Sequence, residues 1–267
     1  VFYDGIVYFT TPYKEIIAIE AISGKVIWKF NSLKKIDARG ILFWLNDQNP
    51  KKSCLLTFDD ELAKMVFWHS SAHVLGQGIE RTFGGHLTIG PPIKGGFYYD
   101  TYVGDDVCTE DKWYPALDKA IKKIVSEKQQ FQRLVVTKEE AMEMFGHNAF
   151  KREIIRTKVP EGTRTTVYRN GTFVDLCLGP HIPNTSMIKA MKVHKHSATY
   201  WMGDSDADSL QRLYAVSFPD NKRLKKWAAD MELRKQNDHR RLGTSQELFF
   251  FHDLSPGSCF FMPHGAR

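Results

Sequence analysis

The sequence predicts an α+β fold, because strand-like and helix-like segments occupy separate stretches of the chain. Short runs of β-branched and aromatic residues dominate the first 57 positions. The stretch ELAKMVFWHSSAHVLGQGIERTFGG, residues 61–85, then places apolar residues at helical spacing and ends in two glycines. Later, Asn170–Gly171 joins two strand-like runs as a hairpin turn does, which indicates antiparallel pairing.

The N-terminal part is expected to contain strands only. GIVYFT, EIIAIEA and KVIWKF are β-rich, and SGK between the last two is typical of a hairpin turn. ARGILFWLNDQ and KKSCLLTFDDE continue the strand pattern around the polar turn NDQNPKK. Residues 4–30 also weakly resemble one repeat of a quinoprotein β-propeller. A single repeat cannot close a propeller, so we expect an appended β-hairpin.

The remaining segments mix strands and helices. LTIGPPIKGGFYYDTYV predicts strand, turn and strand, followed by an acidic loop at 105–111. PALDKAIKKIVSEKQQFQRL predicts a helix that opens with Pro115, and TKEEAMEMF predicts a short helix that opens with a capping box. The other predictions are strands at FKREII, RTTVYRNG and GTFVDLC, a long charged helix at DNKRLKKWAADMELRKQNDHRRLG, and an apolar tail from residue 247.

Composition limits the class of protein. The 267 residues are 42% hydrophobic and 25% charged, which is ordinary for a globular chain with one large or two modest domains. No apolar run approaches the roughly 20 residues that span a bilayer, so no membrane segment is expected. The sequence starts without Met and lacks the features of a signal peptide, so it offers none and suggests a fragment boundary. Four scattered cysteines indicate free thiols in a reducing, cytosolic setting.

Two pairs of residues could carry chemistry. His69 and His73 share one helix face, and Cys177 and His181 are also four residues apart, where a strand runs into a Gly-Pro turn. Metalloprotease chemistry is excluded, because Ser70 stands where HExxH needs glutamate. Three interpretations remain open on spacing alone: a zinc site, a metal-free hydrolytic site with neutral imidazoles, or histidines packed in the core.

A net charge of +6 permits a polyanionic partner without requiring one. Basic residues between 189 and 241 are interleaved with Tyr200, Trp201, Tyr214 and Trp227. A solvated helix surface is the ordinary interpretation of such a run. Contact with the phosphate backbone of a nucleic acid, supported by aromatic side chains, is the alternative.

Five segments together resemble the threonyl-tRNA synthetases of the eukaryotic cytosolic type. They are FWHSSAHVLGQ, GPPIKGGFYYD, TTVYRNGTFVDLCLGPHIPNT, TYWMGDSDADSLQRLYAVSFPD and DHRRLGTSQELFFFHDLSPGSCFFMPHGA, in the order of that family, and the likeness covers about residues 40–267. It implies the fold of the editing domain of a class II synthetase, preceded by a small β-rich segment. The implied domains are a β-rich hairpin at 1–33, a partial ubiquitin-like segment at 34–60, the tRNA editing domain at 61–220, a connecting helix at 221–243 and the start of the aminoacylation domain at 244–267.

The resemblance also implies a site. His69, His73, Cys177 and His181 match the HxxxH and CxxxH pairs of the family's editing pocket, with Lys151 as a further catalytic residue. Asp175 and Tyr99 match residues that bind the substrate. The family's editing pocket is generally metal-free, so no metal or other cofactor is expected there; ATP and zinc would belong to the ligase domain. The family usually has arginine where Leu178 stands. Leucine at this position would weaken a charged contact with tRNA.

The resemblance implies that the chain is the editing part of a threonine-tRNA ligase and hydrolyses seryl ester misplaced on threonine tRNA in the cytoplasm. It implies threonine tRNA as the partner, no membrane, and a homodimer only in the full-length parent. Two alternatives differ in class: a zinc-dependent aminoacyl-tRNA deacylase of the alanyl-tRNA editing type, and a tRNA-binding module without catalysis. Zinc content, and hydrolysis above background, distinguish them.

Overall fold

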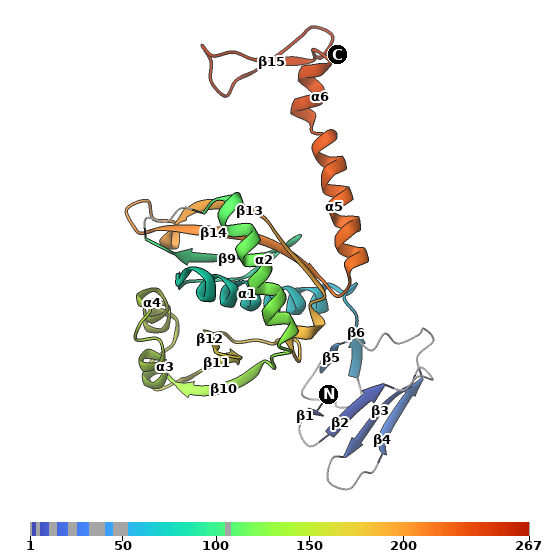
Figure 1. Cartoon of the computed structure of the whole chain (residues 1–267), viewed down its shortest axis with the longest axis vertical. Helices are drawn as coiled ribbons and strands as arrows, with labels where there is room; N and C mark the ends of the chain where they lie inside the picture. Colours follow the sequence, from blue (N-terminus) through green and yellow to red (C-terminus); the bar gives the residue numbers. More distant parts are fainter. Residues whose placement is uncertain are drawn as a thin grey trace. The chain divides into compact units, whose positions relative to one another are not determined.

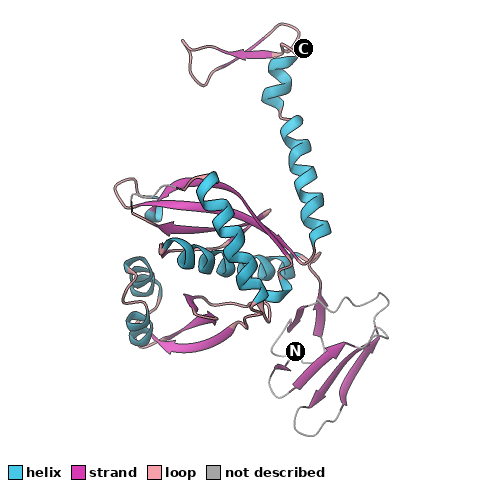
Figure 2. Cartoon of the chain, viewed as in Figure 1, coloured by secondary structure: helices cyan, strands magenta, loops and turns pink. Residues whose placement is uncertain are grey.

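The computed structural model describes the backbone of residues 2–3, 6–10, 15–20, 26–31, 41–44, 53–104 and 108–266, and the side chains of 57–104 and 108–266. Helices and antiparallel sheets both occur, which confirms the predicted α+β class (Figures 1 and 2). The chain divides into two compact units, Val1–Pro219 and Asp220–Arg267. No described helix has the length and apolar character needed to cross a membrane.

The N-terminal strands agree with the sequence pattern. β1 (Phe2–Tyr3), β2 (Ile6–Thr10), β3 (Glu15–Glu20) and β4 (Val26–Asn31) form an antiparallel sheet in chain order. β5 (Ile41–Trp44) pairs with β6 (Ser53–Leu56). The predicted turns SGK and NDQNPKK lie outside the described residues.

Helix α1 (Glu61–Phe83) is the longest described helix and carries half of the predicted site. It ends where Gly84 takes a left-handed φ of 66° and its N–H donates to the Glu80 carbonyl, a conformation that glycine adopts without steric cost. Most residues from Val66 to Ile79 are buried, because the helix is covered on more than one side.

A five-stranded antiparallel sheet supports α1. Its strands are β7 (His86–Leu87), β8 (Pro92–Ile93), β9 (Gly96–Tyr102), β13 (Ala190–Tyr200) and β14 (Ser209–Phe218), with β13-β14-β9-β7 as the order and β8 paired to β9. The strand–turn–strand pattern from residue 87 is thus confirmed, whereas β13 and β14 correspond to no predicted element. The Trp68 indole donates to the Ser217 carbonyl at 3.0 Å and so fixes α1 to β14.

Helix α2 (Glu110–Ser126) packs against α1, with Leu117 and Ile121 beside Gly78. The predicted helix began too late and ended too late. Pro115 lies inside α2 rather than at its start, and residues 132–134 belong to β10. Of the predicted acidic loop, 105–107 lie outside the described residues and 110–111 form the first turn of α2.

A three-stranded antiparallel sheet holds the second half of the site. β10 (Gln132–Thr137), β11 (Arg164–Asn170) and β12 (Phe173–Leu176) pair in chain order, which confirms the hairpin at Asn170–Gly171. Short helix α3 (Lys138–Met144) begins with the predicted capping box, in which Thr137 and Glu140 bond each other's backbone N–H. A 3₁₀ turn at Thr185–Met187 follows the site loop.

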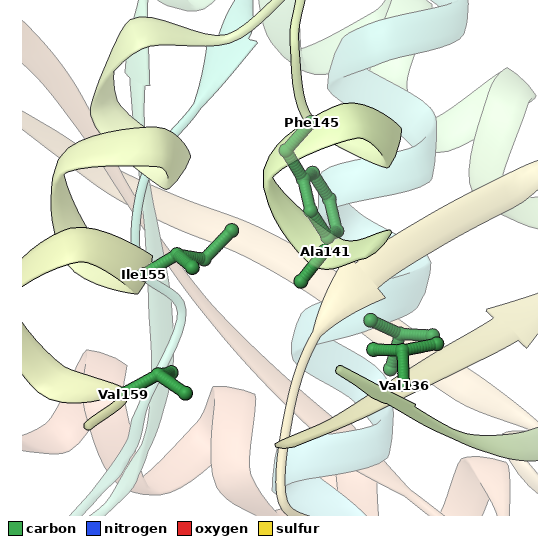
Figure 3. Close-up of a cluster of buried hydrophobic side chains, with 6 residues drawn as sticks. Val136, Ala141, Phe145, Ile155 and Val159 are labelled. Atoms are coloured by element: carbon green, nitrogen blue, oxygen red, sulfur yellow. The ribbon is translucent and has the colours of Figure 1, made fainter. Parts of the chain in front are cut away.

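The predicted strand FKREII is wrong, because it lies in helix α4 (Ala149–Lys158). Asn148 caps that helix by accepting the Lys151 N–H, and Phe150, Ile154 and Ile155 have helical spacing. Ile155 packs in a buried cluster with Val136, Ala141, Phe145, Val159 and Val167 (Figure 3). Phe150 contacts Trp201 and Leu210 in a second cluster. The two clusters hold α4, and therefore Lys151, in place.

The C-terminal unit consists of α5 (Asn221–Gln236), α6 (His239–Ser245) and the pair β15 (Phe249–Phe251) and β16 (Cys259–Phe261). The single long charged helix predicted here is two helices. Asp238 takes an extended conformation and caps α6 by accepting the Arg240 N–H, which ends the first helix and starts the second.

Candidate active site

The two predicted pairs converge. One nitrogen of each of the three histidines and the Cys177 sulfur all lie within 4.8 Å of one another. Cys177 Sγ is 3.2 Å from His69 Nε2 and 3.2 Å from His181 Nε2. The rings of His73 and His181 have centroids 4.3 Å apart. Spacing predicted that His69 and His73 share a helix face, but the meeting of the two pairs across about a hundred residues comes from the fold.

Opposite faces of α1 do different work. His69 and His73 face the site, one helical turn apart, with ring centroids 5.6 Å apart. Ser71 faces β14, where its hydroxyl accepts a hydrogen bond from Ser217 Oγ at 2.7 Å. Because both faces are bonded, the rotation of α1 about its own axis is fixed.

The loop after β12 presents Cys177 and His181. The Cys177 N–H donates to the Thr166 carbonyl, and the Gly179 N–H donates to Cys177 Sγ at 3.2 Å. Gly179 has φ 75°, and a Cβ there would lie 2.2 Å from the Tyr168 hydroxyl. A side chain at Gly179 is therefore excluded by conformation and by space.

Two aromatic rings enclose the His181 imidazole. Phe131 stacks on it with centroids 5.0 Å apart, and Tyr168 meets it edge-on at 4.4 Å. Neither aromatic residue was predicted as part of the site. Both lie in strand-like or irregular stretches where an aromatic residue signals only burial, so the sequence offered no distinctive sign of them.

A second group lies beside His73. Asp175 Oδ1 accepts from Lys151 Nζ at 2.5 Å, and Asp175 Oδ2 accepts from the Tyr99 hydroxyl at 2.5 Å. Asp175 Oδ2 is 3.6 Å from His73 Nε2, which joins the two groups. All seven residues predicted for the site are therefore near one another. Tyr99 is only 1% exposed, with its ring packed against Gly76 and Gly90, so it acts on the site by holding Asp175.

The surroundings keep the imidazoles neutral. Burial lowers the pKa of His73 well below its usual value, and the nearby His69 and Lys151 lower it further. Burial likewise lowers the pKa of His181, with a smaller contribution from His73 and His69. Burial lowers the pKa of His69 too, although Asp175 opposes the shift.

Cys177 is a thiol rather than a thiolate at neutral pH. Burial raises its pKa to about 12, and the hydrogen bond from the Gly179 N–H offsets only part of this. A protonated thiol is a poor nucleophile. Among the described residues His73 Nδ1 has no hydrogen-bonding partner although the side chain is buried. The site therefore offers neutral imidazole nitrogens that accept hydrogen bonds, and no activated cysteine.

The donor set also fits zinc in kind. Three imidazole nitrogens and one sulfur are common zinc ligands, with spacings of roughly 3.3–3.8 Å expected between ligands of a tetrahedral ion. The two contacts of Cys177 at 3.2 Å agree with this, whereas separations approaching 4.8 Å need a small contraction. Residue Leu178, beside Cys177, is 79% exposed and contributes no ligand.

The chain is similar to known proteins over most of its length. A family model described as "Threonyl and Alanyl tRNA synthetase second additional domain" matches residues 165–214. Cytoplasmic threonine–tRNA ligase 1 of Bos taurus is 51% identical over 226 residues, covering 84% of this chain and 31% of that protein. Cytoplasmic threonine–tRNA ligase 2 of Homo sapiens is 48% identical over 267 residues, covering 98% of this chain and 32% of that protein. The cytoplasmic threonine–tRNA ligase of Caenorhabditis elegans is 53% identical over 214 residues, covering 80% of this chain and 29% of that protein.

The chain spans about a third of the length of these curated relatives. The matched family model begins in β11 and ends in β14, so it includes Asp175, Cys177 and His181. Together these matches identify the chain as a homologue of part of the cytoplasmic threonine–tRNA ligases, containing the second additional domain that threonyl- and alanyl-tRNA synthetases share.

Proposed function

We propose that this chain is the editing part of a cytoplasmic threonine-tRNA ligase and hydrolyses seryl ester wrongly attached to threonine tRNA. The observation that carries the proposal is the meeting of His69, His73, Cys177 and His181 in a chain related to these ligases. Neutral imidazoles held together beside a buried ion pair suit the hydrolysis of an ester. Threonine tRNA is then the partner, and the cytoplasm is the compartment, as in the names of the relatives.

Serine and threonine explain why a second site is needed. A synthetic pocket built for threonine cannot strongly reject a smaller analogue, because one methyl group contributes only about 1–3 kcal/mol of discrimination. A hydrolytic pocket that excludes that methyl group removes seryl-tRNA and spares threonyl-tRNA. The region around Cys177 and Asp175 is the part of the site that we assign to the amino acid.

The roles follow from the protonation states. Neutral His73, whose Nδ1 has no protein partner among the described residues, positions the attacking water by accepting a hydrogen bond from it. Lys151 acts through Asp175, which it holds at 2.5 Å, and Tyr99 holds the other carboxylate oxygen. His69 and His181 contact the 3′ end of the tRNA. Cys177 lines the amino-acid pocket as a neutral thiol that contacts the serine side chain.

The decisive experiment compares hydrolysis of seryl-tRNA and threonyl-tRNA by the whole chain. We expect seryl-tRNA to be deacylated much faster, and His73→Ala to slow this by about 10²-fold or more. His86→Ala is the matched control, because His86 is an exposed histidine on β7 outside the site. A His73→Ala variant with full activity would rule out the role of His73. Binding of tRNA without hydrolysis above background would leave the chain as a binding module.

A zinc-dependent aminoacyl-tRNA deacylase is the second candidate, favoured by the spacing of the four ligand atoms within 4.8 Å. His69, His73, Cys177 and His181 would hold the ion, which would supply a Lewis acid for the ester. Zinc content of the purified chain, measured before and after chelation, separates the two candidates. The metal-free proposal expects unchanged activity after chelation, and loss of activity together with one equivalent of zinc would replace it.

A further inference from the structure

Ser70 lies on the site face of α1, between the two predicted histidines. It is fully buried, with 0% exposure, and its oxygen has three partners. Ser70 Oγ donates to the Val66 carbonyl at 2.8 Å and accepts from the Ile182 N–H at 2.9 Å. It also lies 3.1 Å from His181 Nδ1. Ser70 thus contacts both the ring of His181 and the backbone of the next residue.

Counting protons decides the direction of the third contact. A serine hydroxyl has one proton to donate and two lone pairs to accept with. The proton of Ser70 goes to the Val66 carbonyl, and one lone pair accepts the Ile182 N–H. Only the second lone pair remains for His181, so His181 Nδ1 must carry the proton of the neutral ring.

We infer that Ser70 is a positioning residue that fixes His181 as the Nδ1–H tautomer, with Nε2 as the bare acceptor facing Cys177. The catalytic part of this inference rests on the proposed function, whereas the tautomer does not. The assignment also orders the neighbouring protons. Cys177, which has one thiol proton, donates it to His181 Nε2 across 3.2 Å. His69 Nε2–H then donates to the Cys177 sulfur across the other 3.2 Å contact.

This order gives the two histidines different tasks. His181 presents an acceptor toward Cys177 and any substrate group that enters there, so it binds a hydroxyl or ammonium proton and cannot donate to a leaving oxygen. His69 presents a donor at Nε2. If His181 carried its proton on Nε2 instead, three N–H groups, those of His69, His181 and Gly179, would point at the Cys177 sulfur, and the thiol proton would have no acceptor there.

Nitrogen NMR of the whole chain labelled with ¹⁵N-histidine tests the inference near pH 7.5. The His181 signals are assigned by their loss in His181→Gln. We expect Nδ1 to be protonated and Nε2 unprotonated in the unmodified chain. An Nε2–H tautomer there would overturn the inference, whether or not Ser70→Ala folds.

Ser70→Ala and Ser71→Ala form a matched pair for the second measurement. Both serines are 0% exposed and both donate to a carbonyl one helical turn earlier, at 2.8 Å, but only Ser70 contacts His181. Ser70→Ala should populate the Nε2–H tautomer of His181, and Ser71→Ala should not. An unchanged tautomer in folded Ser70→Ala contradicts the inference.

Kinetics on seryl-tRNA separate this inference from the proposed function. We expect kcat to fall about tenfold in Ser70→Ala with a smaller change in KM, because the hydrogen bond orients a ring rather than binding substrate. Ser71→Ala should retain kcat. If the tautomer changes as expected but the unmodified chain hydrolyses no ester, the proposed function fails and the role of Ser70 in fixing His181 stands. If the chain is active and Ser70→Ala keeps both tautomer and kcat, the role of Ser70 fails alone.

Discussion

Lys151 and Asp175 form an ion pair with Nζ and Oδ1 2.5 Å apart, and each side chain is only 6% exposed. The partners come from α4 and β12, so this pair joins the helix to the sheet that carries the site. Removing one partner of such a pair leaves a buried charge without compensation, which is costlier than the loss of a surface pair.

Asp175→Asn should therefore lower the free energy of unfolding by about 3–5 kcal/mol, measured by urea denaturation. Glu127→Gln is the matched control. Glu127, 33% exposed, pairs with Arg81, 29% exposed, and the substitution should cost less than about 1 kcal/mol. Lys151→Met combined with Asp175→Asn should recover part of the loss. Equal losses in the free energy of unfolding for Asp175→Asn and Glu127→Gln would show that the buried pair contributes no more to stability than the surface pair.

Stability should fall as the pH drops below the ordinary pKa of histidine. Burial holds the pKa values of His69, His73 and His181 below 6.5 in the folded chain, while the unfolded chain keeps ordinary values. Below pH 6.5 the unfolded state binds more protons, so acid favours unfolding. The stabilisation is fully present above pH 6.5 and declines at up to roughly 1.4 kcal/mol per pH unit for each histidine.

Urea denaturation between pH 7.5 and 5, with chelator present, measures this slope. His181→Gln should reduce the number of protons taken up on unfolding by about one, which makes the slope shallower. Burial also lowers the pKa of His194. Its contribution to the slope is the same in both proteins and cancels when the two slopes are compared. A slope unaffected by His181→Gln would mean that His181 is already charged in the folded chain.

Gly179→Ala should disrupt the site more than an ordinary glycine substitution does. Gly179 and Gly162 both have positive φ, 75° and 70°, so alanine is strained at either position by roughly 1–2 kcal/mol. Only at Gly179 would the new methyl group meet a neighbour, the Tyr168 hydroxyl at 2.2 Å. Displacing Tyr168 disturbs the ring that packs on His181. We expect Gly179→Ala to lose most of the deacylation activity and Gly162→Ala to retain it; equal activities would contradict this.

Cys177 should resist alkylation despite its place in a chemical site. Burial raises the pKa of its thiol to about 12, so the thiolate fraction at pH 8 is on the order of 10⁻⁴. Cys259 is exposed and is expected to react before Cys177 with iodoacetamide, as followed by mass spectrometry of the two peptides. Cys177 should react at a comparable rate only after unfolding. Faster labelling of Cys177 than of Cys259 in the folded chain would indicate a thiolate.

Local patterns predicted local structure well. The capping box at Thr137, the hairpin at Asn170–Gly171 and the end of α1 at Gly84 each depend on a few neighbouring residues, and each is present. FKREII forms part of α4 although the sequence predicts a strand, because Phe150, Ile154 and Ile155 have helical spacing and pack in two buried clusters. The helix predicted at 221–243 is two helices, because Asp238 caps the start of α6, and a run of charged residues alone does not distinguish a capping aspartate from a solvated one.

The sequence predicted which residues belong to the candidate site, but it did not predict how they are arranged in space. Spacing placed His69 and His73 on one helix face and Cys177 and His181 at one turn, and the resemblance added Lys151, Asp175 and Tyr99. Their distances depend on pairing among strands that are far apart in sequence, which no local pattern encodes. Ser70 was noticed only as the residue that excludes a metalloprotease, because a serine in a buried helix more often bonds its own backbone, which Ser70 also does.

Contacts on two sides fix the orientation of helix α1 about its own axis. Trp68 and Ser71 are bonded to β14 on one side, while His69, Ser70 and His73 meet the site on the other. Inserting or deleting one residue between Trp68 and His73 would turn the residues after it by about 100° relative to those before it, so either the sheet contacts or the imidazoles would be displaced. Lineages that keep this chemistry can therefore exchange side chains along α1, but they cannot change its length between Trp68 and His73.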